Sequence, residues 1–267
     1  MKKFLVTLLA ALLVFSLCAC NAPERPTETA ETTTESDLAY ITEKGTLVIG
    51  ITDYEPMNFK DESGEWTGFD TEFAYLVGEK LGVDVEFIEI DWDNKQNELN
   101  SKSVDCIWNG MTLTDEVMSS METTKPYVIN AQVVVMNADK VSEYADVDSL
   151  KDLKFSVEAG SAGEEALTEN GIENFTAVNT QADALMEVAS GSADACVIDI
   201  TMANAMTGEG TSYEKLTAGL PLTEEEYGIG FRKGSDAAKG VDEIIDELKA
   251  DGSLEELAEK YELTLAD

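Results

Sequence analysis

The sequence predicts an α/β protein made of repeated strand–helix units. From Thr46 onward, short apolar runs of strand length alternate with longer segments in which apolar residues recur at helical spacing. Repeated units of this kind favour parallel sheets covered by helices. Of the 267 residues, 43% are hydrophobic and 27% are charged, which is typical of a globular protein with a packed core. The length fits one large domain or two modest ones.

The order of the predicted elements follows from these patterns. In the segment 69–81 the apolar residues fall on one helix face, and in 83–87 they alternate with acidic ones as in a half-buried strand. The first half is predicted to hold strands at 47–51, 83–87, 104–108 and 133–135, a helix at 69–81 and a polar helix through Leu99. The second half is predicted to hold strands at 155–157, 175–178, 195–200 and 228–231 and helices from Ser161 and at 181–189, 236–250 and 253–261.

The chain is strongly acidic and has no histidine. Its 54 acidic and 18 basic residues give a formal net charge of −36. This charge excludes nucleic acid as a partner, because the phosphate backbone would be repelled. The missing histidine removes Ser/His and Cys/His triads and His-ligated metal sites. A solvated, soluble surface accounts for most of the acidity.

The first residues have the pattern of a secretion signal. Lys2 and Lys3 precede an apolar stretch, Phe4 to Leu17, that is shorter than the roughly 20 residues a membrane span needs. The stretch ends in Leu17-Cys18-Ala19-Cys20, which resembles a bacterial lipobox. We therefore expect a lipoprotein signal peptide at 1–19.

Cys20 is the expected site of lipidation, which makes the protein extracytoplasmic and lipid-anchored to the cell membrane. An ordinary cleaved signal peptide with incidental cysteines is the alternative. Residues 20–40 are dominated by Thr, Glu, Pro and Ala, which predicts a disordered tether.

Two further cysteines, Cys106 and Cys196, lie inside apolar runs. An exported protein can form disulfides. Two strand positions about 90 residues apart are better explained as buried, unpaired thiols.

A series of short motifs gives a family resemblance. The segment Gly68-Phe69-Asp70-Thr71-Glu72-Phe73, followed by Val77-Gly78 and Leu81, resembles the signature of bacterial extracellular solute-binding proteins of the polar amino-acid class, solute-binding protein family 3. These proteins are receptors of ABC importers. The resemblance covers about residues 42–262, and its order continues through Val104-Asp105-Cys106-Ile107, Thr112-Leu113-Thr114, Lys125-Pro126-Tyr127, Gln132-Val133-Val134-Val135, Ala159-Gly160-Ser161 and Gly191-Ser192-Ala193-Asp194-Ala195.

The resemblance implies a two-lobe periplasmic-binding-protein-like fold, with two crossover strands and a ligand cleft between the lobes. Lobe 1 is expected at 41–133 plus 230–267, and lobe 2 at 137–226. The crossings are expected near Val134–Met136 and Tyr227–Ile229, with hinge motion closing the lobes around a ligand.

Asp199 is the first candidate site residue. It ends a predicted strand, and ligands of parallel sheets bind at the carboxyl ends of strands. The resemblance implies that its carboxylate accepts hydrogen bonds from a ligand ammonium, each contributing about 1.5–3 kcal/mol. A helix N-cap is the alternative reading of Asp199, and the two roles are compatible.

Further candidates follow from the same resemblance. Gly160, Ser161 and Ala162 match a turn that binds the ligand carboxylate, although a plain helix N-cap has the same local pattern. Asn109 and Gly110 lie in a segment that offers backbone carbonyls.

Thr112 fits a hydroxyl position beside the ligand carboxylate. Tyr54 and Trp92 match positions that line the pocket for the ligand side chain. Aromatic residues beside strands also serve as core residues.

One departure bears on the ligand. Val117 occupies the position where amino-acid binders of this family carry an arginine for the ligand carboxylate. The two arginines of the chain are Arg25, in the tether, and Arg232, for which we expect a surface role. Either the Ser161 turn and Thr112 hold the carboxylate, or the ligand has an ammonium group and no free carboxylate.

The sequence therefore predicts a monomeric receptor that binds an amino acid or amine ligand and delivers it to an ABC permease. No cofactor, metal or catalytic residue is expected, so the protein is predicted not to be an enzyme. The alternatives are a small-acid dehydratase of the same fold, which needs a cation in the cleft, and a free-standing solute sensor.

Overall fold

The computed structural model describes residues 36–267, so the predicted signal peptide, Cys20 and most of the tether lie outside the described residues. One part of the tether prediction is wrong. Helix α1 spans Asp37–Lys44, so ordered structure begins before residue 40. Ser36 caps this helix by accepting from the backbone N–H of Ala39 at 3.0 Å, and Ser and Asp at a helix start are strong N-terminal signals that the composition of 20–40 conceals.

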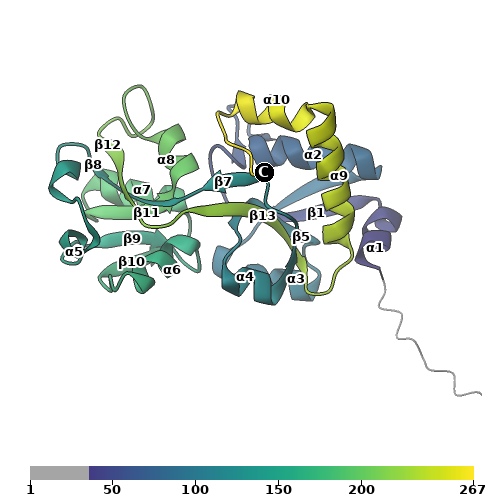
Figure 1. Ribbon diagram of the computed structural model, residues 1–267, viewed down its shortest axis with the longest axis horizontal. Coiled ribbons are helices and arrows are strands. Elements are labelled where there is room, and N and C mark those ends of the chain that lie inside the picture. The colour runs from purple at the N-terminus through teal and green to yellow at the C-terminus, as the bar shows by residue number, and fades with distance from the viewer. Residues whose placement is uncertain (1–35) are drawn as a thin grey trace, which may run out of the picture. The chain divides into compact units, whose positions relative to one another are not determined.

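The described chain contains two large sheets, each flanked by helices (Figure 1). We call the part built on the first sheet lobe 1 and the part built on the second sheet lobe 2. The first sheet has the order β4-β1-β5-β13-β6, and β7 also pairs with β13. Its strands are β1 (Thr46–Ile51), β4 (Asp84–Glu89), β5 (Cys106–Thr112), β6 (Met121–Thr123), β7 (Val128–Asn130) and β13 (Glu225–Arg232).

The second sheet has the order β10-β9-β11-β8-β12. Its strands are β8 (Gln132–Asn137), β9 (Phe155–Glu158), β10 (Phe175–Val178), β11 (Ala195–Asp199) and β12 (Leu216–Pro221). A short hairpin of β2 (Phe59–Lys60) and β3 (Trp66–Thr67) completes the strands of the described chain.

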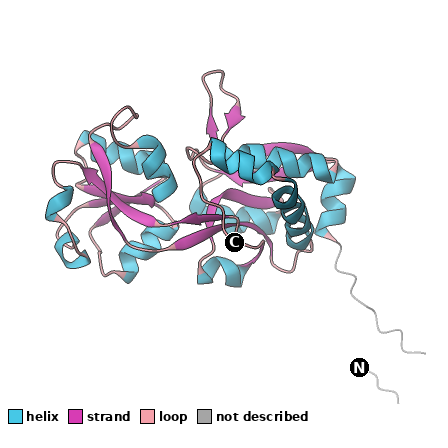
Figure 2. Cartoon of the chain, turned by 45° about the horizontal axis from the view of Figure 1, so that its top comes forward, coloured by secondary structure: helices cyan, strands magenta, loops and turns pink. Residues whose placement is uncertain are grey.

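Helices cover both sheets, as the strand–helix alternation predicts (Figure 2). Those of lobe 1 are α1, α2 (Phe69–Leu81), α3 (Lys95–Ser101), α4 (Asp115–Ser120), α9 (Ala237–Asp251) and α10 (Ser253–Lys260), with the 3-10 turn η1 (Trp92–Asn94). Those of lobe 2 are α5 (Val147–Leu150), α6 (Ala162–Glu169), α7 (Gln181–Ser190) and α8 (Ile200–Met206), with the 3-10 turn η2 (Val141–Glu143). The strands β1, β5, β9 and β11 lie in the sheet interiors, which explains their continuous apolar runs.

The sheets are mixed rather than purely parallel. The pairs β1–β4, β1–β5, β9–β10 and β9–β11 are parallel. The two strands that follow a passage between the lobes, β8 and β13, pair antiparallel with their neighbours β11 and β5. A crossing strand enters its new sheet from the other lobe, so its direction is not set by a strand–helix unit.

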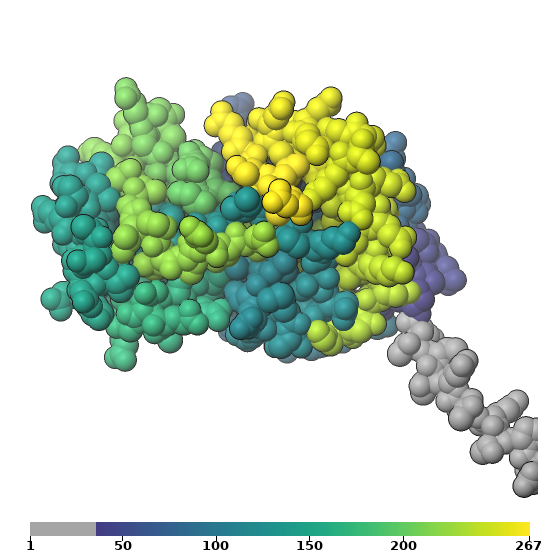
Figure 3. All heavy atoms as spheres, in the orientation of Figure 1, coloured from purple at the N-terminus to yellow at the C-terminus, as the bar shows by residue number. Residues whose placement is uncertain are grey.

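Both crossings lie earlier in the chain than the sequence predicts. β7 belongs to the first sheet and β8 to the second, so the first crossing falls at Ala131 rather than at 134–136. β12 belongs to the second sheet and β13 to the first, so the return crossing falls at 222–224 rather than at 227–229. In Figure 3 the light-green return segment runs across the visible face between the two lobes. An apolar run in the sequence predicts a strand but not the strand with which it pairs. The boundaries between the lobes therefore follow only from the hydrogen-bonded strand pairs of the structure.

The described cysteines behave as predicted, and one arginine does not. Cys106 and Cys196 are buried and unpaired. Arg232, expected at the surface, is only 9% exposed. Its Nε donates to Asp37 Oδ2 at 3.0 Å and its Nη1 to the Val104 carbonyl at 2.9 Å. Helix α1, which the sequence prediction omitted, supplies the carboxylate that permits this burial.

Candidate functional site

A cavity of about 580 Å³ lies between residues of the two lobes. This volume falls in the range of small-molecule sites. All nine residues predicted to bind ligand line it: Tyr54, Trp92, Asn109, Gly110, Thr112, Gly160, Ser161, Ala162 and Asp199. The structure therefore brings the predicted set together, and their contact with a ligand stays a prediction.

Asp199 is buried at the carboxyl end of β11, with 3% of its surface exposed. Its Oδ1 accepts from the amides of Asn130 and Gln132, the latter at 2.7 Å, and its Oδ2 accepts from the amide of Gln181. Asp199 occupies the N-cap position of α8, but its side chain makes no capping bond. Its carboxylate is thus oriented by three amides towards the cavity rather than used by the helix.

Burial and the nearby carboxylate of Glu225 raise the pKa of Asp199 from 3.8 to about 7, although its hydrogen bonds oppose the shift. Glu225 is the first residue of β13, directly after the return crossing. Asn130 and Gln132 donate to its Oε1, each at 2.6 Å, as well as to Asp199. One pair of amides therefore holds two carboxyl groups close together, which favours a neutral form of one of them.

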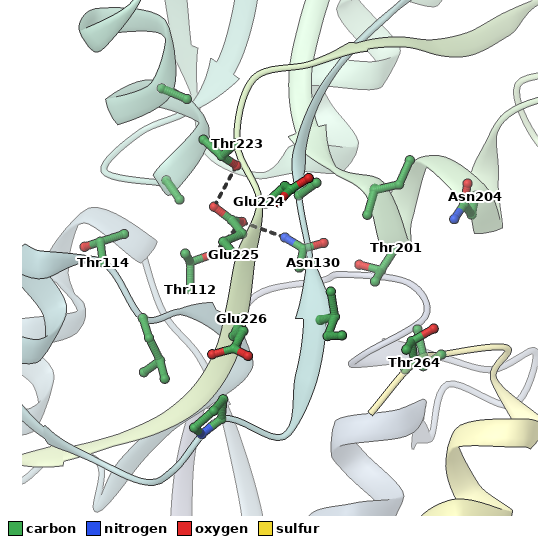
Figure 4. Close-up of a pocket in the computed structure, with 18 of the residues that line it drawn as sticks. Thr112, Thr114, Asn130, Thr201, Asn204, Thr223, Glu224, Glu225, Glu226 and Thr264 are labelled. Carbon is green, nitrogen blue, oxygen red and sulfur yellow. Dashed lines mark hydrogen bonds between the residues drawn. The ribbon is translucent and has the colours of Figure 1, made fainter. Parts of the chain in front are cut away.

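The same cluster ties both crossings together. Asn130 ends β7 and Gln132 begins β8, on either side of the first crossing. Thr223 in the return crossing donates to Glu225 Oε2 at 3.1 Å and accepts from the Gln132 backbone N–H at 2.8 Å. Figure 4 shows Thr223, Glu225 and Asn130 meeting beside the crossings, in a larger hollow of about 1520 Å³ that shares Thr112 with the site cavity.

Two predicted polar residues of lobe 1 are already engaged within the protein. Thr112 Oγ1 donates to Glu225 Oε1 at 2.8 Å. The amide of Asn109 donates to the Thr52 carbonyl at 3.0 Å and accepts from the Thr52 backbone N–H at 3.0 Å. Asn109 therefore fixes the carboxyl end of β1 against β5, and the Thr112 hydroxyl hydrogen faces a carboxylate of the protein itself.

The turn before α6 is capped by side chains of its own residues. Ser161 Oγ accepts from the Glu164 backbone N–H at 3.2 Å, and Glu164 Oε2 accepts from the Gly160 backbone N–H at 2.6 Å. The first bond is that of a capping box, but the N–H that Glu164 binds belongs to Gly160, the residue before the cap, and not to Ser161 itself. The donor at Gly160 that was predicted to face a ligand carboxylate thus binds the carboxylate of Glu164.

Gly110 shows how the family signature positions the cavity wall. Its φ is +53°, and an added Cβ would come within 2.6 Å of a ring carbon of Tyr54. The Gly110 N–H donates to Asp70 Oδ2 at 2.6 Å, and the hydroxyl of Tyr127 donates to the same oxygen at 3.0 Å. Asp70 of the signature is therefore a positioning residue beneath the cavity, held at the start of α2.

Tyr54 and Trp92 combine the two roles that the sequence left open, since both are buried and both line the cavity. The hydroxyl of Tyr54 bonds with those of Thr201 and Tyr227, which links lobe 1 to α8 of lobe 2. Trp92 and Val117 belong to one buried apolar cluster, and Val117 also lines the cavity.

Sequence reasoning missed the cation in the cavity. Lys95 lines it, and its ammonium donates to the carbonyls of Gly160 at 2.8 Å and Trp92 at 3.3 Å. Desolvation by burial lowers its pKa. No pattern distinguishes Lys95 from the other lysines, because its shorter bond, to Gly160, forms only when lobe 2 approaches.

Gln132, Gln181 and Glu158 were also missed, and a signal for two of them existed. Glu158 ends β9, a neighbour of β11, and so meets the same strand-end rule as Asp199. Gln132 begins the motif Gln132-Val133-Val134-Val135 of the family resemblance, and the structure pairs it with Asp199 in the antiparallel ladder of β8 and β11. Gln181 begins α7 and could not be distinguished from any other helix-start residue.

The comparison with known families decides the class of protein. The model of the bacterial extracellular solute-binding proteins, family 3, matches residues 47–264. The chain belongs to this family. Family 3 proteins act outside the cytoplasm, so this chain is an extracytoplasmic solute-binding protein. In residues 36–267, no helix has the length and apolarity that a membrane crossing requires.

Individual relatives resemble this family 3 protein along nearly its whole folded part. The L-cystine-binding protein TcyJ of Escherichia coli is 29% identical over 231 residues, covering 85% of this chain and 86% of the relative. An ABC uptake transporter substrate-binding protein from Streptococcus pneumoniae, solved with bound histidine, has a TM-score of 0.78 and 27% identity, covering 86% and 97% of the two chains. The ancestral amino acid-binding protein AncCDT-1, a precursor of cyclohexadienyl dehydratase, has a TM-score of 0.77 and 31% identity, covering 85% and 99%.

Proposed function

We propose that this family 3 protein is the receptor of an ABC importer for an amino acid or another small amine-bearing solute, and that Asp199 accepts the ammonium group of the solute. The single observation that carries the proposal is the buried Asp199 carboxylate, which three amides hold at the cavity. A buried carboxylate oriented in this way is a strong acceptor for an ammonium ion. The relatives named above for cystine and histidine bind solutes that carry such a group.

The proposal also includes the expectations from the sequence for lobe closure, solute contacts and membrane anchoring. Closure of the lobes occurs by movement at 131 and 222–224, the full set of nine lining residues contacts the solute, and Cys20 carries a lipid anchor. The receptor works as a monomer that hands its solute to a membrane permease, and it is not an enzyme. A dehydratase would use a cavity cation for its acid substrate, and the ammonium of Lys95 is already held by two carbonyls.

Isothermal titration of the folded part with the standard amino acids and a panel of small amines tests the proposal. We expect at least one compound to bind, and the variant Asp199→Asn to weaken its binding by 10-fold or more, because a charge-assisted hydrogen bond contributes about 1.5–3 kcal/mol. Asp194→Asn, an exposed change just before the same strand, is the matched control and should bind as the wild type does.

Two results speak against the proposal. If no compound from either panel binds, the receptor function for this class of solute is contradicted. If Asp199→Asn binds as tightly as the wild type, the ammonium assignment is wrong.

A further inference from the structure

Glu158 is a carboxyl group in the cavity that the assignments above leave unused. It is the last residue of β9, lines the cavity and is 3% exposed. Its Oε1 is fully buried and has no hydrogen-bond partner in the described part of the chain. An unpaired buried polar atom costs about 1–3 kcal/mol, so this one calls for a partner from outside the protein.

The environment of Glu158 differs from that of Asp199. Each oxygen of Asp199 accepts from an amide, whereas Oε1 of Glu158 faces none. Lys95 lines the same cavity, but its ammonium donates to two backbone carbonyls instead. The cavity therefore presents two buried carboxyl groups, one held by the protein and one with an oxygen free to accept.

Two of the groups predicted to bind a solute carboxylate are engaged by carboxylates of the protein. Thr112 donates to Glu225, and the Gly160 N–H donates to Glu164. Val117 supplies only an apolar surface where an arginine would donate. A carboxylate on the solute would have to displace these internal partners to bind at Thr112 or Gly160.

The charged side chains that line the cavity also favour a cationic solute over one with a carboxylate. Seven carboxyl side chains and one lysine line it: Asp93, Glu116, Glu158, Glu164, Glu165, Glu169, Asp199 and Lys95. A cleft lined by one sign of charge concentrates ions of the opposite sign. Positive groups on the solute are therefore attracted, and a negative group is repelled.

We propose that the solute is a small cation with two amine or guanidine groups and no carboxylate, one cationic group bound by Asp199 and the second by Glu158. This inference rests on the proposed function and narrows it to the alternative without a free carboxylate. The second cation gives Oε1 of Glu158 the partner that the protein lacks.

Matched compounds test the solute class on the wild-type protein. Titrations compare α,ω-diaminoalkanes of three to six carbons and agmatine with lysine, ornithine and arginine, which add a carboxylate, and with 1-aminopentane, which lacks the second cation. We expect the tightest diamine or agmatine to bind at least 10-fold more tightly than its amino-acid counterpart and than 1-aminopentane. Tighter binding of the free amino acid, or equal binding of the monoamine, overturns the proposal.

The variant Glu158→Gln tests the residue. It should weaken binding of the diamine at least 10-fold and leave that of 1-aminopentane unchanged, because only the diamine reaches Glu158. Glu173→Gln, an exposed change in the same lobe before β10, is the matched control. Equal losses for both compounds would mean that Glu158 supports the cavity and does not bind the second cation.

The number of protons released on binding tests the role of Glu158 in the wild-type protein. Burial and the charge of Asp199 raise the pKa of Glu158 from 4.5 to about 8, with Asp183 adding to the rise and Lys95 and the Thr52 hydroxyl opposing it. A cation bound at Glu158 favours its ionised form, so diamine binding at pH 7 should release more protons than monoamine binding. Titration in two buffers of different ionisation enthalpy measures this difference, and no excess release contradicts the proposal.

The outcomes separate this inference from the function on which it rests. A free amino acid that binds through Asp199 while every diamine fails contradicts this inference and leaves the receptor function standing. If no amino acid and no amine binds, both fall together.

Discussion

At the scale of single residues, the cavity depends on internal partners that the family pattern does not reveal. Thr112, Ser161 and Gly160 were predicted as groups for a ligand carboxylate, and each bonds to Glu225 or Glu164 within the protein. Asp199 differs because its partners are amides, which orient a carboxylate without neutralising it. The cavity is therefore better matched to positive than to negative groups.

Val117→Arg should reverse this preference. Val117 is 7% exposed on α4 and lines the cavity, so an arginine there can present its guanidinium to a solute carboxylate. We expect the affinity for free amino acids to rise about 10-fold or more, and that for diamines to fall by charge repulsion. Titration with lysine and 1,5-diaminopentane measures both changes. A loss of lysine binding would mean that the carboxylate of a bound amino acid does not lie beside position 117.

At the scale of elements, strand ends and helix starts build the site. β9 and β11 are parallel neighbours and bring Glu158 and Asp199 to one edge of the second sheet. The antiparallel strand β8 begins at that edge, where Gln132 is paired with Asp199. The amides of Asn130 and Gln132 flank the first crossing and hold Glu225 beside the second, so the crossings and the site share one hydrogen-bond cluster.

Ser161→Ala separates the two readings of the turn before α6. As a helix cap, Ser161 stabilises the fold, and its loss should lower the free energy of unfolding by about 1 kcal/mol. Because its oxygen already accepts from Glu164, binding of the solute should change by less than twofold. Urea unfolding and titration measure the two effects; a large loss of affinity with unchanged stability would show that the hydroxyl binds solute.

At the scale of the whole molecule, three buried carboxyl groups hold protons that an unfolded chain would release. Burial is the main cause in each case, and it raises the pKa of Asp70 and Asp199 to about 7 and that of Glu158 to about 8. Groups with raised pKa values in the folded state stabilise it fully below their unfolded pKa values near 4, and this contribution is lost as the pH rises through 7 to 8.

The ligand-free protein should therefore become less stable between pH 6 and pH 8. Each additional proton held by the folded state contributes a slope of up to about 1.36 kcal/mol per pH unit, and exposed carboxylates are already ionised in this range. Urea unfolding at pH 6, 7 and 8 measures the change, and Glu158→Gln should reduce its slope. Stability that is flat or rises across this range contradicts the prediction.

The sequence by itself determined the alternating α/β fold, most of its strands and helices and the buried thiols, because these features depend on local periodicity, which a single chain displays directly. The nine residues around the cavity followed from the resemblance to the family, which rests on motifs in a fixed order. Helix α2, for example, has its predicted bounds at 69 and 81, because a glycine turn and an apolar face define it.

Only the tertiary structure decided which partners those residues have. The crossings at 131 and 222–224 depend on the ladders that each strand joins. The burial of Arg232 depends on Asp37, nearly 200 residues away in sequence. In the cavity, Lys95 meets Gly160 because the two lobes bring them together, and Asp199 meets Gln132 because β8 and β11 are neighbours in the second sheet. Charge and hydrogen bonding act through space, so the engaged donors and the unpaired oxygen of Glu158 appear only after folding.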